Sequence, residues 1–270
     1  ALRRVDVRAL ARRRVRAGFD SAETTDHNRR HWAMADALSA DAAASPDVRR
    51  TLRNRARYEV ANNSYARGIV LTLANDTVGT GPRLQMLSDD PGINHTVETS
   101  FHAWAQAVGL AQKLRTMRMA RSQDGEAFAV LAFNPLVEHD VQLDLLLVEA
   151  DQIATPWRRV PDEHEVDGLI LDDFGNPVGY RVMKNHPGST NQSFLDDFTT
   201  VPAPAMLHIF RQDRPGQHRG IPEITPALPL FAQLRRFTLA VLSAAEAAAD
   251  FAGILYTDAP ANGEADAVEP

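Results

Sequence analysis

One stretch, Pro226 to Ala252, most constrains what this chain can fold into. Its apolar residues recur three or four positions apart, which is the spacing of one face of an α-helix. They are Leu230, Leu234, Phe237, Val241, Ala245, Ala248 and Ala252. At about 1.5 Å per residue this segment would reach about 40 Å. We therefore predict a single long helix with a continuous apolar stripe.

The opposite side of this helix is polar. It carries Arg235, Arg236, Ser243, Glu246 and Asp250. Acids near a helix C-terminus oppose the helix dipole, so the stability of the isolated helix does not explain them. A membrane span is not expected, because each acid would cost about 2.5 to 3.5 kcal/mol near the bilayer centre. Two interpretations remain: a long core helix, or an Ala-rich rod that packs beside copies of itself.

The composition is that of a soluble, globular chain. Its 270 residues, 44% of them hydrophobic, suffice for one large domain or two ordinary ones. With no cysteine, it has no disulfide framework, thiolate nucleophile or Cys-ligated metal site, which fits a reducing cytoplasm. No signal peptide is expected, because Leu2 to Gly18 is Arg-rich without an apolar core. Both ends have the character of cut ends.

Charge is divided unevenly along the chain. Residues 1–67 hold 15 Arg against 8 acids, whereas the remainder holds 14 basic and 27 acidic residues. A basic leading arm therefore precedes an acidic body. Such an arm can bind nucleic acid through release of counterions, or its Arg side chains can simply be solvated.

The first half of the chain reads as helical. Ser45, Pro46 and Asp47 form a helix start with an N-cap, a first-turn proline and a first-turn acid. Asn62 to Ser64 marks a joint, and Gly79 to Pro82 ends the next helix. The helices expected in this half are Ala1–Arg16, Asn28–Leu38, Pro46–Asn63, Tyr65–Val78, Asn94–Val108 and Leu110–Arg121.

From about residue 122 the apolar period changes to 2, which indicates strands. An earlier short strand is expected at Arg83–Leu87, a hairpin turn at Asp172–Pro177 and an exposed loop at His186–Pro204. The strands expected here are Glu126–Phe133, Val141–Val148, Gly168–Leu171, Val178–Met183 and Met206–Phe210. Helices, a small antiparallel sheet and then the long helix make an α+β chain.

Motifs for chemistry are scarce. The chain contains no GxSxG, Walker or GxGxxG motif, and His27 and His31 lack the third ligand and the glutamate of a zinc protease. The clusters Glu138-His139-Asp140 and Glu163-His164-Glu165 could serve a two-metal nuclease, but both lie where loops are expected. We predict no catalytic residue, no metal ligand and no cofactor.

A basic segment precedes the long helix. Arg211, Arg214, His218 and Arg219 surround a Pro-Gly turn. They could grip phosphates, or they could form salt bridges with acids of this chain or of a neighbouring subunit.

Several phrases of the sequence, in this order, resemble the lambda-type portal proteins of tailed bacteriophages. They are Ala17–Asp20 followed by Arg29, Arg30 and Trp32; Leu52–Ile69; Val78–Gly81 with Leu84 and Gln85; Asp124–Phe128; Glu149–Ile153; Gly168–Val182; Leu207–Phe210; and Arg214–Pro222. Each phrase alone is weak, but their order and spacing extend over about residues 17 to 256.

The resemblance implies a homo-oligomeric ring, usually twelvefold, at one vertex of the capsid. The terminase packs double-stranded DNA through such a ring, and the DNA is later ejected through it. The ring would contact this DNA without sequence specificity. Further implied partners are the major capsid protein and the head–tail connector proteins, with no membrane and no active site. The implied location is the portal vertex of the virion, after assembly in the host bacterial cytoplasm.

The resemblance also implies a division of the chain into four parts. Residues 1–45 would be an arm and a helix, and residues 46–220 would be the wing, with helices at 46–121 and an SH3-like β part at 122–210. Residues 221–252 would be the first stem helix, and residues 253–270 would begin a truncated clip. Arg235, Arg236, Glu246 and Asp250 become candidates for facing the channel and its DNA, since an acidic lining would avoid tight phosphate binding. Arg211, Arg214, His218 and Arg219 are candidates for subunit interfaces or phosphates. The alternatives are a metal-dependent nucleic-acid-processing enzyme using Asp140 and Glu165, and a DNA-binding module using the Arg-rich arm.

Overall fold

The computed structural model describes residues 24–156, 162, 164–190 and 197–250. The chain separates into two units, Ala1–Ser39 and Ala40–Pro270. In the described part of the first unit, residues 26–34 form turns, so the predicted helix Asn28–Leu38 is wrong. Trp32 and Met34 are 55% and 92% exposed, so packing within the described residues of this unit does not stabilise a helix there. The predicted helix Ala1–Arg16 lies outside the described residues.

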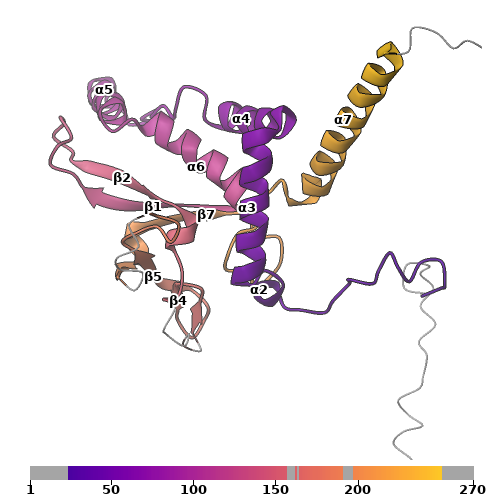
Figure 1. Ribbon diagram of the computed structural model, residues 1–270. Helices are drawn as coiled ribbons and strands as arrows, with labels where there is room; N and C mark the ends of the chain where they lie inside the picture. The colour runs from indigo at the N-terminus through magenta and orange to yellow at the C-terminus, as the bar shows by residue number, and fades with distance from the viewer. Residues whose placement is uncertain (1–23, 157–161, 163, 191–196, 251–270) are drawn as a thin grey trace, which may run out of the picture. The chain divides into compact units, whose positions relative to one another are not determined.

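The second unit combines helices with antiparallel sheets, which confirms the α+β class (Figure 1). Its α-helices are α2 (Ala40–Ala43), α3 (Pro46–Asn62), α4 (Ser64–Val78), α5 (Pro91–Ala107), α6 (Leu110–Asp124) and α7 (Leu228–Asp250), with 3-10 turns η2 (Ala150–Gln152), η3 (Ala203–Ala205) and η4 (Thr225–Ala227). None of the helices seen in the described residues could cross a membrane.

Local signals account for the helix boundaries. Pro46 opens α3, and the joint predicted at Asn62 to Ser64 separates α3 from α4. The side chain of Asn63 caps α4 by accepting hydrogen bonds from the backbone N–H groups of Tyr65 and Ala66. Gly79 then ends α4 with a φ of 54°.

Two antiparallel sheets follow the helices. The first has the order β2-β1-β7 and the second the order β3-β4-β5-β6. Their strands are β1 (Glu126–Phe133), β2 (Leu143–Val148), β3 (Glu165–Val166), β4 (Leu169–Leu171), β5 (Pro177–Met183), β6 (Phe198–Pro202) and β7 (Met206–Phe210). All five strands predicted after residue 122 are present, and β1 and β7 have the predicted bounds.

Two expectations about the strands are wrong. Arg83–Leu87 pairs with no strand among the described residues; instead the N–H of Met86 donates to the Glu98 carboxylate of α5 at 2.8 Å. The predicted loop His186–Pro204 contains β6, which pairs with β5 and leaves Thr199 and Thr200 exposed. Strand β6 was missed because it is an edge strand with two threonines and a proline, and its residues do not alternate between apolar and polar.

Strand β1 organises the cores on both faces of the first sheet. Ala127 and Ala129 pack toward α6, in a cluster with Met117 and Leu145. Phe128, which points to the other face, packs toward the second sheet. A third cluster joins α3 and α4 to the first turn of α7.

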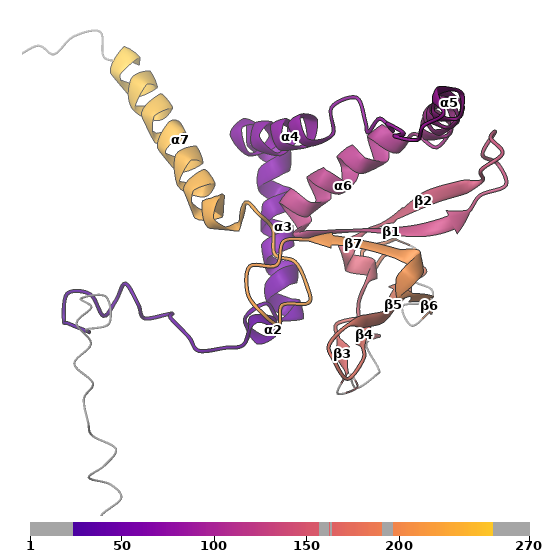
Figure 2. The same ribbon diagram turned by 180° about the vertical axis from the view of Figure 1, so that it is seen from behind.

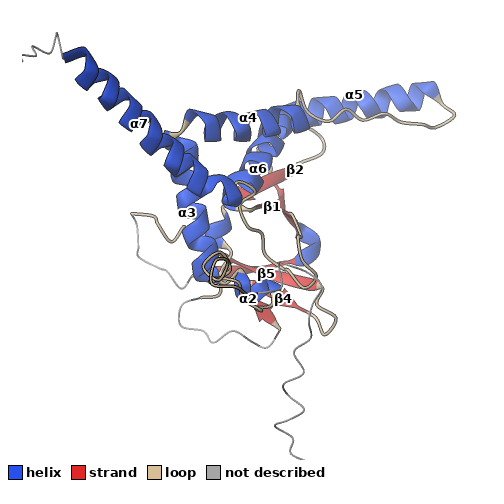
Figure 3. Ribbon diagram, turned by 90° about the vertical axis from the view of Figure 1, so that its right-hand side faces the viewer, coloured by secondary structure: helices blue, strands red, loops and turns tan. Residues whose placement is uncertain are grey.

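Helix α7 confirms the predicted long helix, but within the described part of the chain it packs only at its base. Leu228 and Phe231 are its buried residues, and the rest of the helix leaves α3 (Figures 1 and 3). The interpretation as a long core helix is therefore wrong for this chain.

The segment that leads into α7 touches the start of β1 at two glycines. Gly125 has a φ of +94°, and a Cβ placed on it would lie 2.5 Å from the carbonyl carbon of Ile221. A Cβ on Gly220 would meet the carbonyl oxygen of Gly125 at 2.1 Å. Only glycine allows these two backbones to approach so closely.

We expect Gly125→Ala to destabilise the protein by about 1 to 3 kcal/mol or more, because the new methyl group meets backbone atoms and the positive φ strains the residue. The matched control is Gly68→Ala in α4, where a Cβ meets nothing within 4 Å. The control should be stabilised by about 0.5 to 1 kcal/mol. Urea unfolding followed by circular dichroism measures both, and equal midpoints for the two variants would contradict the close approach.

Candidate functional site

The base of α7 is held against α3 by apolar and polar contacts. Leu228 and Phe231 join the buried cluster of Ala56 and Val60. Arg235 forms an ion pair with Glu59, and its guanidinium carbon lies 5.1 Å from the centre of the Tyr58 ring. These contacts set the point at which α7 leaves the rest of the chain.

Beyond this base, α7 exposes a large apolar surface. Phe231 follows Leu230 by about 100° around the axis, so the predicted stripe is not the face that meets α3. Six large apolar side chains are each between 39% and 66% exposed: Leu230, Leu234, Phe237, Leu239, Val241 and Leu242. Exposed apolar side chains gathered on one helix are typical of surfaces that bind another molecule.

The charged residues of α7 divide between two roles. Arg235 is half-buried and paired within the chain, whereas Arg236, Glu246 and Asp250 are exposed. The expectation that these residues face a DNA channel stays a prediction.

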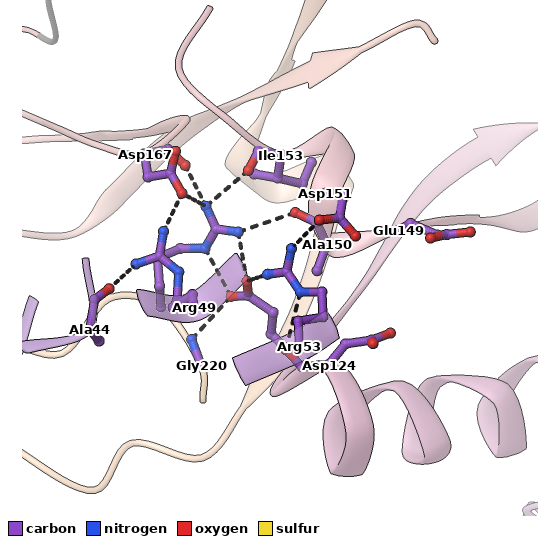
Figure 4. A network of polar contacts seen from close by, with 12 residues as sticks. Ala44, Arg49, Arg53, Asp124, Glu149, Ala150, Asp151, Ile153, Asp167 and Gly220 are labelled. Carbon is purple, nitrogen blue, oxygen red and sulfur yellow. Dashed lines mark hydrogen bonds and ion pairs between the residues drawn. The ribbon is translucent and has the colours of Figure 1, made fainter. Parts of the chain in front are cut away.

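A cluster of buried charges holds the segment before α7, and Figure 4 labels several of its members, among them Arg49, Arg53, Asp151 and Asp167. Glu126, fully buried at the start of β1, accepts two hydrogen bonds from Arg219, at 2.6 Å and 2.9 Å. The backbone N–H of Gly220 donates to the same carboxylate at 3.1 Å, and Nη2 of Arg53 donates at 3.3 Å. Arg219 also donates to the carbonyl oxygen of Ile153 at 3.0 Å. The bidentate contact between Arg219 and Glu126 fixes the orientation of the two side chains as well as pairing their charges.

Helix α3 contributes three arginines to this cluster, each four residues after the last and therefore on one face. Arg49 pairs with Asp167, whose backbone has a φ of 43° in the turn between β3 and β4. Arg53 pairs with Asp151 at 2.6 Å, and Arg57 pairs with Asp124 at 2.7 Å and with Asp151 at 2.8 Å. One helix face thus binds acids from α6, β1, η2 and the β3–β4 turn.

The cluster sets the protonation of its members. Burial by itself would raise the pKa of Glu126, but the charge of Arg219 and the hydrogen bond from His208 outweigh it and hold this pKa well below its ordinary value. Burial lowers the pKa of His208, against the opposing effect of Glu126. A neutral His208 can donate its Nε2 proton to the carboxylate, at 3.2 Å. Both groups therefore resist protonation in the folded state.

The basic segment before α7 bonds to acids of its own chain. Arg219 is 1% exposed and occupied by Glu126, so the structure gives it an internal role and no access to phosphate. His218 contacts Asp41 of α2 at 2.6 Å, and the exposed Arg211 contacts Asp213 at 2.6 Å. Arg214 is exposed. The sequence left two interpretations of this segment, binding of phosphates and pairing with acids. Arg211, His218 and Arg219 are each paired with an acid of the same chain.

The two acidic clusters noted in the sequence are not assembled into one site. Glu138 and Asp140 lie in the β1–β2 turn, whereas Glu165 is buried in β3 and bound to Arg181 at 3.0 Å. Across the described part of the chain, the group with metal-ligating geometry is instead Glu149, Asp151 and His186. Its two carboxylates already contact Arg57.

Sequence reasoning missed the buried cluster. Two signals were present: a glutamate opens the otherwise apolar strand Glu126–Phe133, and Arg49, Arg53 and Arg57 recur four residues apart. A repeat of arginines predicts one helix face, but only the fold shows that this face is inside.

Two comparisons relate this chain to known proteins. A family model described as "Phage portal protein, lambda family" matches residues 26–269. The chain is also similar to the "Probable portal protein" of Halomonas phage phiHAP-1, with 23% identity over 260 residues. That alignment covers 89% of this chain and 49% of the relative, so the chain spans about half of the relative's length.

We expect Glu126→Gln to destabilise the folded state by about 3 to 5 kcal/mol, because it leaves the Arg219 and Arg53 charges buried without their carboxylate. Asp197→Asn is the control: it breaks an exposed ion pair with Lys184, at 2.9 Å, and should cost less than about 1 kcal/mol. Chemical denaturation measures both. A cost for Glu126→Gln as small as that of the control would contradict the role of the cluster.

The stability should also fall with acid in two stages. His208 and Glu126 both have pKa values below their ordinary ones when folded, so the unfolded chain binds their protons first. Stability is then complete above about pH 7, declines below about 6.5 through His208, and declines further below about 4.3 through Glu126 together with other acids of lowered pKa such as Asp151 and Glu223. Urea midpoints measured from pH 8 to pH 4 follow this, and His208→Asn should remove the first decline. A midpoint that stays constant from pH 8 to pH 5 would contradict the assignment to His208.

Proposed function

The chain belongs to the lambda family of phage portal proteins, and on that basis we propose that it forms, with copies of itself, the ring-shaped channel at one capsid vertex. Double-stranded DNA would be packaged and ejected through this channel. Because the chain spans about half of its relative, the proposal concerns the assembly in which this portion takes part.

The exposed surface of α7 carries the proposal. A helix whose buried residues are confined to its first turn, and whose large apolar side chains face solvent further on, needs a partner to cover them. In a ring, each subunit contacts its two neighbours through two different surfaces. The α7 helices of successive subunits can therefore lie side by side and cover each other's apolar side chains. The Ala-rich second half of α7 permits close approach of neighbouring backbones.

The finer domain assignment is part of the proposal. Residues 1–45 would be an arm, 46–220 the wing with an SH3-like β part at 122–210, and 221–252 the first stem helix. The start of the clip, proposed for 253–270, lies outside the described residues. The two small sheets that share Phe128 and Tyr180 in one core are consistent with a compact β part of the wing.

Contact with DNA would be non-specific and weak. Glu246 and Asp250 are exposed near the end of α7 and would give the channel an acidic lining that holds phosphates loosely. Arg236 would be a basic rung. Because Arg235 is paired with Glu59, its contribution to the channel would require that pair to open. Arg211 and Arg214 are proposed to contact a neighbouring subunit.

The proposed partners follow from the family. They are the terminase during packaging, and the major capsid protein and head–tail connector proteins in the particle. The location would be the portal vertex of the virion, after assembly in the host bacterial cytoplasm. The protein is proposed to be structural, with no catalytic activity of its own.

The two other functions have less support. A nuclease using Asp140 and Glu165 would need both carboxylates at one site, but Asp140 lies in the β1–β2 turn and Glu165 lies in β3, where it is paired with Arg181. A DNA-binding role for the Arg-rich arm depends on residues 1–16, which lie outside the described residues.

We expect the full-length chain to form a closed ring in solution, and the double variant Phe237→Asp/Val241→Asp to stay monomeric. Both side chains are exposed, 66% and 51%, so the substitution should change the monomer's stability by no more than about 0.5 kcal/mol. Light scattering coupled to gel filtration measures the mass, and negative-stain images show the ring.

The matched control is Ser243→Asp, which adds a charge to the polar side of the same exposed helix, away from the apolar stripe. It should lower assembly less than the double variant does. A wild-type chain that stays monomeric under all conditions would refute the ring.

A further inference from the structure

A second apolar surface lies at the turn between β1 and β2. Phe133, Leu136 and Val141 are 75%, 86% and 49% exposed, although they belong to a well-formed hairpin. Two exposed acids, Glu138 and Asp140, stand among them. We call these five residues the hairpin tip.

The hairpin tip is held in one shape before any partner binds. Asn134 accepts a hydrogen bond from the N–H of Leu136 at 3.0 Å and donates its own side-chain amide to Asp144 at 2.9 Å. Val137, in the same turn, is buried against the α6 side of the first sheet. A turn that is already ordered loses little conformational entropy on binding.

An apolar groove lies between α3 and the base of α7. Its walls come from Leu52 and Tyr58 on one side and from Leu228, Pro229 and Ala232 on the other. Two charged residues also line it: Glu59, which is paired with Arg235, and Arg55, which is exposed and has no ion pair within the described part of the chain. We call this the α3–α7 groove.

The two surfaces are complementary in charge and lie on opposite sides of the unit that contains them. Glu138 and Asp140 at the hairpin tip could pair with Arg55 at the groove, while their apolar neighbours enter between α3 and α7. Figures 1 and 2 show the β1–β2 hairpin and α7 on opposite sides of the unit from Ala40 to Asp250. Such a pair cannot meet within one chain, but it can meet between successive copies in a head-to-tail ring.

We propose that the hairpin tip of one subunit docks in the α3–α7 groove of the next. This inference rests on the proposed ring and adds to it a specific contact away from the stripe of α7. The contact would place Leu136 of one copy beside Ala232 of its neighbour, with Arg55 facing Glu138 and Asp140. It would also brace the base of each α7 against the adjacent subunit.

Disulfide trapping tests the contact, because the chain has no cysteine of its own. We expect the full-length chain carrying Leu136→Cys and Ala232→Cys to give, after brief oxidation, a ladder of linked multimers on a denaturing gel. Each single variant can give dimers at most. The control pair Leu87→Cys/Ala232→Cys, which replaces the 96% exposed Leu87 instead, should give no ladder.

A charge exchange provides a second readout. Arg55→Glu should abolish the ladder, and adding Glu138→Arg with Asp140→Arg should restore it. If light scattering shows that rings assemble but oxidation gives no ladder, this inference is overturned, while the proposed portal ring is not affected. A chain that forms no ring would overturn both, and a ladder unaffected by Arg55→Glu would overturn the pairing of charges.

Discussion

The carboxylate of Glu126 is the point on which the rest of the structure depends. It is fully buried, and it stays ionised because Arg219, Arg53 and His208 converge on it. Removing two charges from water is expensive, and the cost is offset here only because nearly every donor and acceptor finds a partner. The same contacts connect β1, α3 and the segment before α7. One buried carboxylate therefore helps to fix the segment that leads into the long helix.

A second constraint at the same place is steric. Gly125 and Gly220 bring the start of β1 and the segment before α7 into backbone contact, and the N–H of Gly220 donates to Glu126. The ion pairs and the glycines thus act on one short stretch, which links the β part of the molecule to the base of α7. Movement of one sheet relative to α3 would have to disturb these contacts.

The contrast with the rest of α7 is the main functional feature. The base of α7 is held by buried apolar side chains, by the Arg235–Glu59 ion pair and by the contact of Arg235 with the Tyr58 ring. The apolar side chains further along α7 have no partner among the described residues of the chain. A rigidly mounted helix with an uncovered apolar side suits assembly with identical neighbours. The hairpin tip and the α3–α7 groove extend the same principle to a second pair of surfaces.

Much of the fold was predictable from the sequence, because local patterns dictate it. Ser45-Pro46-Asp47, the apolar alternation of Glu126–Phe133, the joint at Asn63 and the stripe of the long helix each specify an element through neighbouring residues, and the ordered phrases identified the family. Asn28–Leu38 failed because its described residues form turns and leave Trp32 and Met34 exposed, and Arg83–Leu87 failed because it pairs with no strand in the described part of the chain. Only the tertiary structure decided that Arg219 is interior, that Arg235 is paired with Glu59, and that the α7 stripe is uncovered. The physical reason is distance along the chain: Arg219 and Glu126 are 93 residues apart, and an ion pair between them depends on the packing of every element in between.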